Sequence, residues 1–327
     1  MIARMRLNSE FIHKQTPLAN TMTVHIGISP IAWQNDDLPD LTSAYTMDQA
    51  LKESREIGYT GVERGQRMPR DTEGLRLYLD TYNLALCGGW CSGNTLVNDV
   101  KEEIIAIQEQ VAQFSALNAP CIVYSECSNT IQGKQTIPVN QRPKLERDAI
   151  KAYAHKLGEI GKWCADQGMP LAYHHHMGSI IEGEEDLCWL MDYSEPSAVH
   201  LCFDTGHLLF GGGDVMKTLD RFGDRILHVH FKDIRPDVVR TVRDKDLSFL
   251  DAVIAGAFTV PGDGCIDFMA IGKALKSMEY KGWIVVEAEQ DPQKAPPYDY
   301  AQKGYEHILL VCAAAGLQIA GPEISKG

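Results

Sequence analysis

VHLCFDTGHLLFGGGDVMKTLDRFGDRILHVHFKD, residues 199–233, contains two short apolar runs that each end in ionisable residues. The first run is VHLCFD (199–204) and the second is ILHVHFKD (226–233). Runs of this length that are rich in β-branched and aromatic residues are typical of strands. The chain between them is long enough for the helix that connects two parallel strands. The stretch therefore predicts one strand–helix–strand unit of a parallel sheet.

The same alternation continues in both directions along the chain. Several predicted helices end at a glycine that leads into the next strand, as in ADQGMPLAY and YKGWIVVE, which is typical of a helix C-cap. Repeated units of this kind favour an α/β fold closed into a (β/α)8 TIM barrel, although a doubly wound open sheet has the same local pattern. The eight predicted strands are residues 23–29, 59–63, 84–90, 121–126, 170–176, 199–204, 226–233 and 283–289.

The length of 327 residues is compatible with one large domain. We predict a single barrel domain over residues 23–317, an N-terminal tail over 1–22 and a C-terminal tail over 318–327. The N-terminal segment lacks the uninterrupted apolar stretch of a secretory signal. Two long insertions, residues 128–145 and 234–264, follow predicted strands at the end where barrel enzymes carry active-site loops. A neutral surface insertion is the alternative for the first of them.

The composition excludes several classes of protein. Apolar residues make up 44% and charged residues 23%, with no tract long enough to span a bilayer, so we expect a soluble protein without a membrane partner. A net charge of −13 and the lack of a Lys/Arg run disfavour nucleic acid as a partner. The nine cysteines show no CxxC spacing, and we interpret them as reduced core thiols of a cytoplasmic protein. Nothing specifies an oligomeric state, and a homo-oligomer stays open.

Residues that can bind a metal ion fall at the ends of four consecutive predicted strands. In a parallel barrel the carboxyl ends of the strands meet at one mouth, so these side chains are expected to converge. A single histidine at a strand end is usually structural, but the repetition over four strands predicts a divalent metal site. Mixed His and carboxylate ligands suit Mn²⁺, Co²⁺, Fe²⁺ or Zn²⁺ better than Mg²⁺. The residues are His174, His176, Asp204, His207, His228, His230, Glu287 and Glu289.

Four motifs resemble the xylose-isomerase-like barrels, a group that includes sugar-phosphate isomerases, epimerases and an endonuclease. They are FDTGH, HVHFKD, PGDGCIDF and WIVVE. Within that group the chain most resembles the inosose dehydratase family of inositol catabolism. That resemblance lies in GISPIAWQNDDLP (27–39), GVERGQRMPRD (61–71), GGWCSG (88–93), YHHHMGS (173–179) and VVEAEQDP (285–292), and it extends over nearly the whole chain.

The resemblance implies metal ligands at Asp204, His230 and Glu287. The broader group has a Glu at the end of the fifth strand, where this chain has His174 in YHHHMGS. We assign His174 as the fourth ligand, with His176 and Glu182 as open alternatives. Mn²⁺ and Co²⁺ are the preferred ions, and Zn²⁺ and Fe²⁺ the alternatives.

The reaction implied by the resemblance is the removal of water from 2-keto-myo-inositol (scyllo-inosose), a small polyol ketone. This is an elimination β to a ketone, in which a metal-stabilised enolate forms and two protons are transferred. For the acid and base we predict His176 or His207 as one partner and Lys232 or Glu289 as the other. The alternative for Lys232 is a salt bridge to Asp233 or Glu287.

Polar and aromatic residues near the ends of the early strands are candidates for the wall that receives the polyol ring. Aromatic faces pack on the apolar face of a sugar, and carboxylates and amides bind hydroxyls. Ordinary packing is the alternative for the two tryptophans. The predicted substrate-binding residues are Trp33, Asn35, Asp36, Trp90 and Glu126.

Three other functions are compatible with parts of this pattern. A keto-sugar isomerase or epimerase would use the same barrel, metal and proton abstraction, and loss of water distinguishes a dehydratase from it. A nuclease would need more metal ligands and a basic groove, which the net charge of −13 disfavours. A non-catalytic sugar-binding barrel is disfavoured by the joint presence of Asp204, His230 and Glu287.

Overall fold

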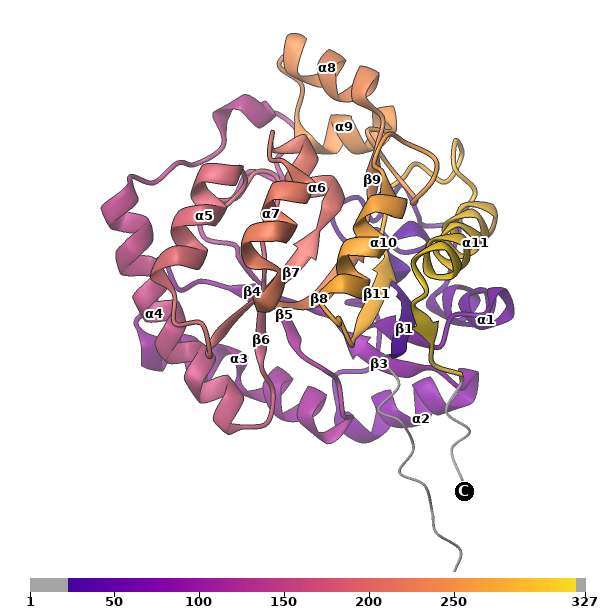
Figure 1. The fold of residues 1–327 in the computed structure, drawn as a ribbon, viewed down its shortest axis with the longest axis horizontal. Coiled ribbons are helices and arrows are strands. Elements are labelled where there is room, and N and C mark those ends of the chain that lie inside the picture. Colours follow the sequence, from indigo (N-terminus) through magenta and orange to yellow (C-terminus); the bar gives the residue numbers. More distant parts are fainter. Residues whose placement is uncertain (1–22, 322–327) are drawn as a thin grey trace, which may run out of the picture.

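The computed structural model of the protein describes residues 23–321. A parallel sheet in the order β3-β2-β1-β11-β8-β7-β6-β5-β4 forms the centre, and helices surround it (Figure 1). The predicted TIM barrel is confirmed. The strands of the barrel are β1 (Thr23–Ile28), β2 (Gly61–Glu63), β3 (Ala85–Gly88), β4 (Trp90–Gly93), β5 (Ile122–Glu126), β6 (Leu171–His174), β7 (Val199–Asp204), β8 (Ile226–Phe231) and β11 (Trp283–Val286).

The third predicted strand, residues 84–90, is two strands in the structure. β3 pairs with β2, and β4 pairs with β5, so the two ends of the sheet are successive pieces of one chain segment. Gly88 and Gly89 at the break have φ of +146° and +154°. Residues that carry a side chain rarely adopt this backbone conformation. In addition, a Cβ on Gly89 would lie 2.9 Å from the backbone nitrogen of Arg64. The barrel therefore closes through a bend that requires glycine.

Most of the helices follow the strands and cover the outside of the barrel (Figure 1). Several begin at a side chain that caps them, such as Thr46, Asp71 and Asp99. The helices are α1 (Met47–Ile57), α2 (Thr72–Tyr82), α3 (Val100–Ala116), α4 (Arg147–Asp166), α5 (Glu184–Tyr193), α6 (Thr205–Phe210), α7 (Val215–Phe222), α8 (Pro236–Asp244), α9 (Phe249–Ala255), α10 (Phe268–Ser277) and α11 (Pro297–Ala315), with short 3-10 turns η1 (Pro30–Ala32), η2 (Val139–Gln141) and η3 (Gly223–Arg225).

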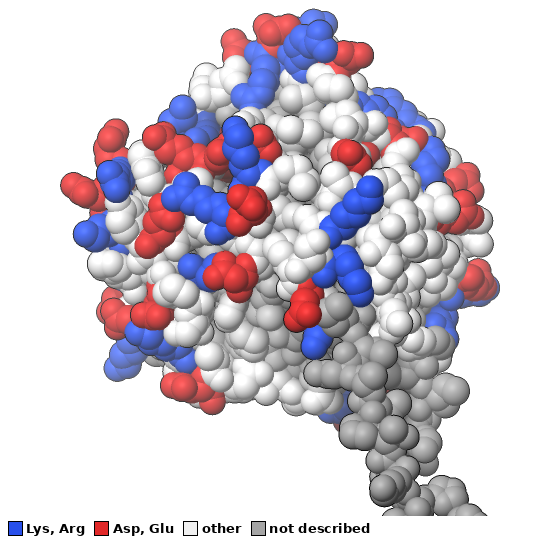
Figure 2. Space-filling model, viewed as in Figure 1, with Lys and Arg blue, Asp and Glu red and all other residues white. Residues whose placement is uncertain are grey.

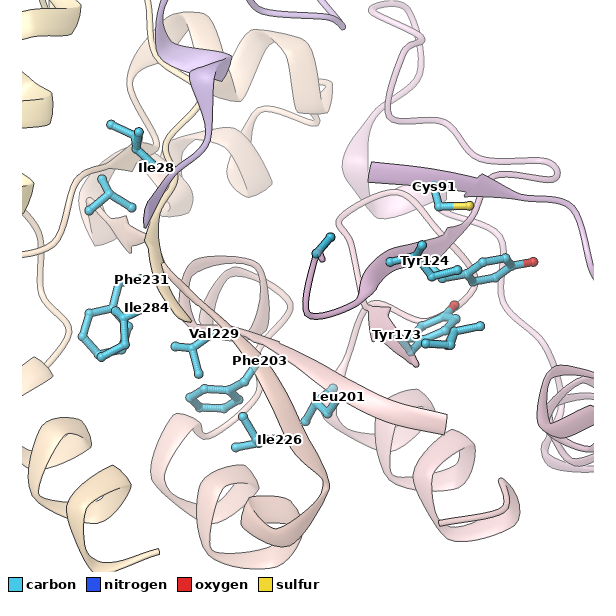
Figure 3. Packing of buried hydrophobic residues seen from close by; sticks show 14 of the residues in the cluster. Ile28, Cys91, Tyr124, Tyr173, Leu201, Phe203, Ile226, Val229, Phe231 and Ile284 are labelled. Carbon is cyan, nitrogen blue, oxygen red and sulfur yellow. The ribbon is translucent and has the colours of Figure 1, made fainter. Parts of the chain in front are cut away.

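The main hydrophobic core lies between the sheet and these helices. Figure 3 shows Leu201, Phe203, Val229 and Phe231 among its members, and all four are fully buried. They alternate along β7 and β8 with the ionisable residues, so period-two alternation directs the ionisable ones into the barrel. Apolar packing outside the barrel thus positions the polar interior.

The two insertions pack against each other. The first contains η2, and the second contains β9 (Asp233–Ile234), α8, α9 and β10 (Phe258–Thr259). The amide of Val139 donates to the carbonyl of Leu247 at 2.9 Å, and the Asn140 amide donates to Asp246 at 2.7 Å. Val139 also joins Val242 and Phe249 in a second buried apolar cluster. In Figure 1, α8 and α9 project from the barrel at the top.

The predicted tails lie at the limits of the described chain. Residues 1–22 are outside the described residues. β12 (Gln318–Ile319) pairs in parallel with β1, so the ordered sheet continues two residues into the predicted tail 318–327.

Surface and composition features bear on possible partners. No helix within residues 23–321 combines the length and apolarity needed to cross a membrane. On the face in Figure 2, basic and acidic side chains are interspersed rather than gathered into one basic patch. All nine cysteines are free, but Cys265 is exposed and Cys127 and Cys188 are partly buried, so the prediction of core thiols is wrong for these three. They lie in loops or on a helix surface rather than in the sheet.

Asp233 organises the loop before α10. One carboxylate oxygen accepts hydrogen bonds from the amides of Ile234, Cys265 and Ile266 at 2.9–3.0 Å. The other accepts from Gly264 at 2.9 Å and Gly262 at 3.2 Å. One buried side chain thus satisfies five backbone donors, four of them in PGDGCI (261–266) and the fifth at Ile234.

We predict that Asp233→Ala lowers the free energy of unfolding by about 3 kcal/mol, because it leaves several buried donors without a partner. Urea denaturation measures the change. Asp237→Ala is the matched control, since this carboxylate is 91% exposed and pairs only with Arg240. Equal effects of the two substitutions would contradict the structural role of Asp233.

Candidate active site

A cavity of about 320 Å³ opens at the carboxyl ends of the barrel strands. It is lined by loops after β1, β2 and β5, by residues of β4, and by residues following β6 and β11. Ionisable side chains dominate the inner end, where Glu63, His176, His230, Glu287 and Glu289 line the cavity. The inner end is therefore the part of the cavity in which acid–base and metal chemistry is concentrated.

The four predicted metal ligands converge at the inner end. His230 Nδ1 lies 2.9 Å from Glu287 Oε2, 3.5 Å from Asp204 Oδ2 and 3.2 Å from His174 Nε2. His174 Nε2 is also 3.5 Å from Asp204 Oδ2. All four residues are buried. The structure thus brings together donors from β6, β7, β8 and the end of β11.

Strand pairing explains this convergence. Asp204 is the register partner of His230, and His174 is the partner of Cys202 on the neighbouring strand. Neighbouring strands lie about 4.8 Å apart, so residues in register at the strand ends stay within reach of one ion. Glu287 is the first residue after β11.

Several predicted strands end earlier than the sequence indicates. β6 ends at His174, β8 at Phe231 and β11 at Val286, so His176, Lys232, Glu287 and Glu289 belong to the following loops. His207 is in helix α6, which begins after Asp204. Asp204 Oδ1 accepts a hydrogen bond from the amide of His207 at 2.7 Å, so the carboxylate also caps this helix.

Lys232 neutralises part of the negative charge of the carboxylates at the inner end of the cavity. Its Nζ lies 2.7 Å from Glu287 Oε1, 2.8 Å from Glu289 Oε2 and 3.6 Å from Asp204 Oδ2. It is also 2.9 Å from His207 Nε2. Burial alone would lower the pKa of Lys232, but the three carboxylates outweigh burial and raise it. Lys232 is therefore an ammonium ion, paired with Glu287 and not with Asp233.

The four predicted acid–base residues are divided by their access to the cavity. His176 and Glu289 line it, with His176 Nε2 3.9 Å from Glu289 Oε1. Lys232 and His207 are fully buried and do not line it. They lie on the far side of Glu289, whose Oε1 is 3.6 Å from His207 Nε2.

The alternatives to His174 at the fifth strand occupy other positions. His176 Nδ1 lies 2.8 Å from the carbonyl oxygen of Met177 and its ring lies against that of His207. Glu182 accepts a hydrogen bond from the Gly178 amide at 2.7 Å and pairs with Arg142 at 3.4 Å. Glu182 is thus held in the loop after β6 and away from Asp204.

Two of the five predicted wall residues, Asp36 and Trp90, line the cavity, and the other three do not. Trp33 is fully buried and its indole donates to Glu53 at 2.6 Å. Asn35 Oδ1 accepts from two backbone amides of its own loop, at 2.9 Å each. Glu126 accepts from the amides of Ser128 and Leu96 at 2.9 and 3.1 Å. These three side chains therefore contact the loops and the core in this structure and not the cavity.

Glu63 is an important cavity residue that the sequence prediction missed. Its Oε1 lies 3.0 Å from Nε2 of both His228 and His230. A carboxylate can only accept, so it keeps a proton on His230 Nε2 and leaves Nδ1 facing Asp204. Burial raises the pKa of Glu63, but the two imidazoles outweigh it and hold the pKa at about 2. The signal was available, because Glu63 ends an apolar strand just as Glu287 does.

The donor set fits a divalent cation. The carboxylates of Glu63, Asp204, Glu287 and Glu289 outnumber the single ammonium of Lys232 in the same buried region. Among the described residues 23–321, Asp204 Oδ2 has no hydrogen-bond donor. A buried carboxylate oxygen without a donor is costly, and a bound cation removes that cost. Nitrogen and oxygen donors in this ratio suit a transition-metal ion.

Comparison with known proteins agrees with the fold and the site. Residues 51–309 match the family described as xylose isomerase-like TIM barrel. The chain is 42% identical over 302 residues to the rhizopine catabolism protein MocC of Rhizobium meliloti. The matched region covers 92% of this chain and 93% of that protein. It is 40% identical over 290 residues to the inosose dehydratase of Clostridium tetani (strain Massachusetts / E88), covering 88% and 97% of the two chains.

Solved structures share the fold at low sequence identity. A probable 3-DHS dehydratase, AsbF, from Bacillus anthracis has a TM-score of 0.62 at 12% identity and covers 88% of this chain and 99% of that chain. A D-allulose 3-epimerase from Methylomonas sp. has a TM-score of 0.61 at 16% identity, covering 88% and 97%.

The chain therefore belongs to the xylose isomerase-like TIM barrel family. Within that family it is 40% identical to several inosose dehydratases over about nine-tenths of its length, and it is an enzyme of the hydro-lyase class.

We predict that Lys232→Met lowers the free energy of unfolding of the metal-free protein by about 3–5 kcal/mol, because three buried carboxylates lose their ammonium partner. Urea denaturation in the presence of a chelator measures the effect. Lys217→Met is the matched control, since Lys217 is 74% exposed and pairs with a surface aspartate. A loss no larger than that of the control would mean that the carboxylates do not depend on Lys232.

Proposed function

We propose that this protein is a metal-dependent dehydratase that removes water from 2-keto-myo-inositol (scyllo-inosose) in myo-inositol catabolism. The observation that carries the proposal is 40% identity to inosose dehydratases over about nine-tenths of the chain, combined with a buried ionisable cluster at the mouth of the barrel. A cytoplasmic location is part of the proposal and is supported by nine free cysteines. Assembly into a homo-oligomer stays an open part of it.

His174, Asp204, His230 and Glu287 would hold the metal ion, for which Mn²⁺ or Co²⁺ is proposed and Zn²⁺ or Fe²⁺ is the alternative. When bound, such an ion acts as a Lewis acid that stabilises the negative charge of an enolate. Glu63 orients His230 from behind through the 3.0 Å contact with Nε2. This contact fixes which ring nitrogen is offered to the ion.

Proton transfer is assigned to His176 and Glu289 among the four predicted residues, because these two line the cavity. Lys232 Nζ lies 2.8 Å from Glu289 Oε2 and holds this carboxylate in place, so we assign Glu289 as the base for the proton α to the ketone. The edge of the His176 ring faces Trp90, with the ring centroids 5.4 Å apart. His207 and Lys232, which do not line the cavity, contact Glu289 and position it.

The remaining wall suits a polyol ring. Trp90 offers an aromatic surface for the apolar face of a ring, and Asp36 offers a carboxylate for hydroxyl groups. Gln34, Gln66 and Gln132 also line the cavity and were not predicted from the sequence. The amide of Gln34 is already bonded to Trp33, Tyr45 and Arg67. The amides of Gln66 and Gln132 can both donate to and accept from hydroxyl groups, which suits a neutral, densely hydroxylated substrate.

We expect the purified protein with Mn²⁺ or Co²⁺ to convert scyllo-inosose with a rise in ultraviolet absorbance from the enolised dione. Mass spectrometry should show loss of one water. A chelator should abolish the reaction, and Asp204→Asn should lower kcat/KM by more than tenfold, since the loss of one ligand weakens the metal site. Absence of water loss with all four metals would refute the dehydratase proposal. A product of unchanged mass would indicate the isomerase or epimerase alternative.

We predict that Glu63→Ala weakens Co²⁺ binding by about 10–100-fold, because His230 loses the group that orients it. Isothermal titration calorimetry measures the affinity, and the absorption spectrum of the Co²⁺ protein reports the ligand geometry. Glu63→Gln should retain part of the affinity, since its amide oxygen still accepts from the ring. Glu56→Ala, on the exposed side of α1, is the control. Equal affinity of Glu63→Ala and the control would refute the role of Glu63.

A further inference from the structure

Dehydration needs two proton transfers at different atoms of the substrate. One proton leaves the carbon next to the ketone, and another joins the departing hydroxyl group. His176 and Glu289 lie on the side of the cavity that carries the metal-binding cluster. A cavity-lining group outside that cluster is therefore of interest, because the departing hydroxyl group is a different atom from the carbon that loses the α-proton.

Asp37 is the carboxyl group that meets this description. It lies in the loop after β1, is partly buried and lines the cavity. Asn35 Oδ1 accepts hydrogen bonds from the amides of Asp37 and Leu38 at 2.9 Å each. The backbone amide of Asn35 in turn donates to Thr42 Oγ1 at 2.9 Å. These backbone hydrogen bonds position Asp37 without using its carboxyl group.

The surroundings of Asp37 favour a protonated carboxyl group. Within residues 23–321, no hydrogen-bond donor reaches its carboxyl oxygens. Burial is the largest cause that raises its pKa to about 6, and the carboxylates of Glu289, Asp36 and Glu287 raise it further, whereas Lys232 lowers it. Cys127 is the other titratable group near it, and burial keeps this thiol neutral, with a pKa of about 11. Asp37 thus holds its proton more firmly than an ordinary aspartic acid.

The neighbouring Asp36 has a different environment. It is more exposed, and although burial raises its pKa as well, the amide of Gln66, 3.4 Å from Oδ2, and the guanidinium groups of Arg67 and Arg70 oppose this rise. Glu289 is likewise beside the Lys232 ammonium. When carboxyl groups of one cavity lie in such unlike surroundings, the one among negative charges suits the acid role and the one beside a cation suits the base role.

We propose that Asp37 is the general acid that protonates the departing hydroxyl group. The inference rests on the proposed dehydratase function and adds a catalytic residue to it. The base on the metal side takes the α-proton, and the electron pair of that C–H bond forms the enolate. The enolate pair then forms the carbon–carbon double bond while the C–O bond to the β-hydroxyl breaks. The departing oxygen takes the proton of Asp37 and leaves as water. The base then releases the α-proton to solvent, and solvent returns a proton to the Asp37 carboxylate.

The role of Asp37 as an acid makes kcat/KM depend on pH. The active form is the protonated acid, so its contribution to kcat/KM is present at low pH and is lost as the pH rises through about 6. Asp37→Asn should remove this decline. It should also lower kcat by about 10²–10⁴-fold while leaving KM nearly unchanged, as expected for the loss of an acid that acts in the transition state.

Two measurements separate an acid from a structural residue. In D₂O, Asp37→Asn should still exchange the α-proton of scyllo-inosose, followed by NMR, because enolate formation does not need the acid. An analogue with fluoride in place of the departing hydroxyl should react with Asp37→Asn nearly as fast as with the wild type, because fluoride leaves without protonation. Asp40→Asn, an exposed position of the same loop, is the control for both.

Three results would overturn the assignment. They are wild-type kcat in Asp37→Asn, simultaneous loss of α-proton exchange and dehydration, and failure of the fluoro analogue to rescue the variant. Asp36→Asn should change KM and keep the decline near pH 6, and loss of that decline would transfer the acid role to Asp36. A wild-type protein that neither exchanges nor dehydrates scyllo-inosose would instead refute the proposed function, which keeps the two failures distinct.

Discussion

The accumulation of negative charge at the inner end of the barrel is the constraint on which the rest of the site depends. Burying several carboxylates near each other is unfavourable unless cations or hydrogen-bond donors compensate them. Lys232 and His230 supply part of this compensation from β8 and the residue that follows it, within 3 Å of Glu287. The compensation is incomplete, since Asp204 Oδ2 lacks a donor within the part of the chain that the structure describes. A scaffold that leaves this deficit is suited to a divalent cation, and the surrounding packing holds the carboxylates in place.

Rigid and adaptable parts of the site have different origins. The proposed ligands His174 and Asp204 end their strands and His230 is the last residue but one of its strand, and the opposite faces of these strands are packed under the helices. Asp36, Asp37 and Gln66 lie on loops instead. Barrel enzymes commonly combine a fixed group at strand ends with variable loops, which allows one scaffold to accept different substrates. This division explains why a dehydratase and an epimerase can share the fold at 12–16% identity with this chain.

The sequence predicted the fold and the core of the site because both depend on periodicity. Alternation along VHLCFD and ILHVHFKD places Asp204 and His230 inside the barrel, and the structure has them there. It was less informative about loops. Trp33 and Asn35 were predicted to contact substrate because they follow a strand, but local hydrogen bonds turn them toward α1 and toward their own backbone. The extent of the strands was overestimated as well, since β6, β8 and β11 end at His174, Phe231 and Val286.

The two insertions have a consequence for how this enzyme could be altered. Thr130, Gln132 and Gly133 of the first insertion line the cavity, whereas the second insertion supports the first from outside through Leu247 and Asp246. Recognition of the substrate therefore depends in part on residues that never touch it. Transplanting the first loop alone into a related barrel would separate it from its support. Two segments about a hundred residues apart in the sequence thus act together at this edge of the barrel. Substitutions in one segment are expected to be accompanied by substitutions in the other.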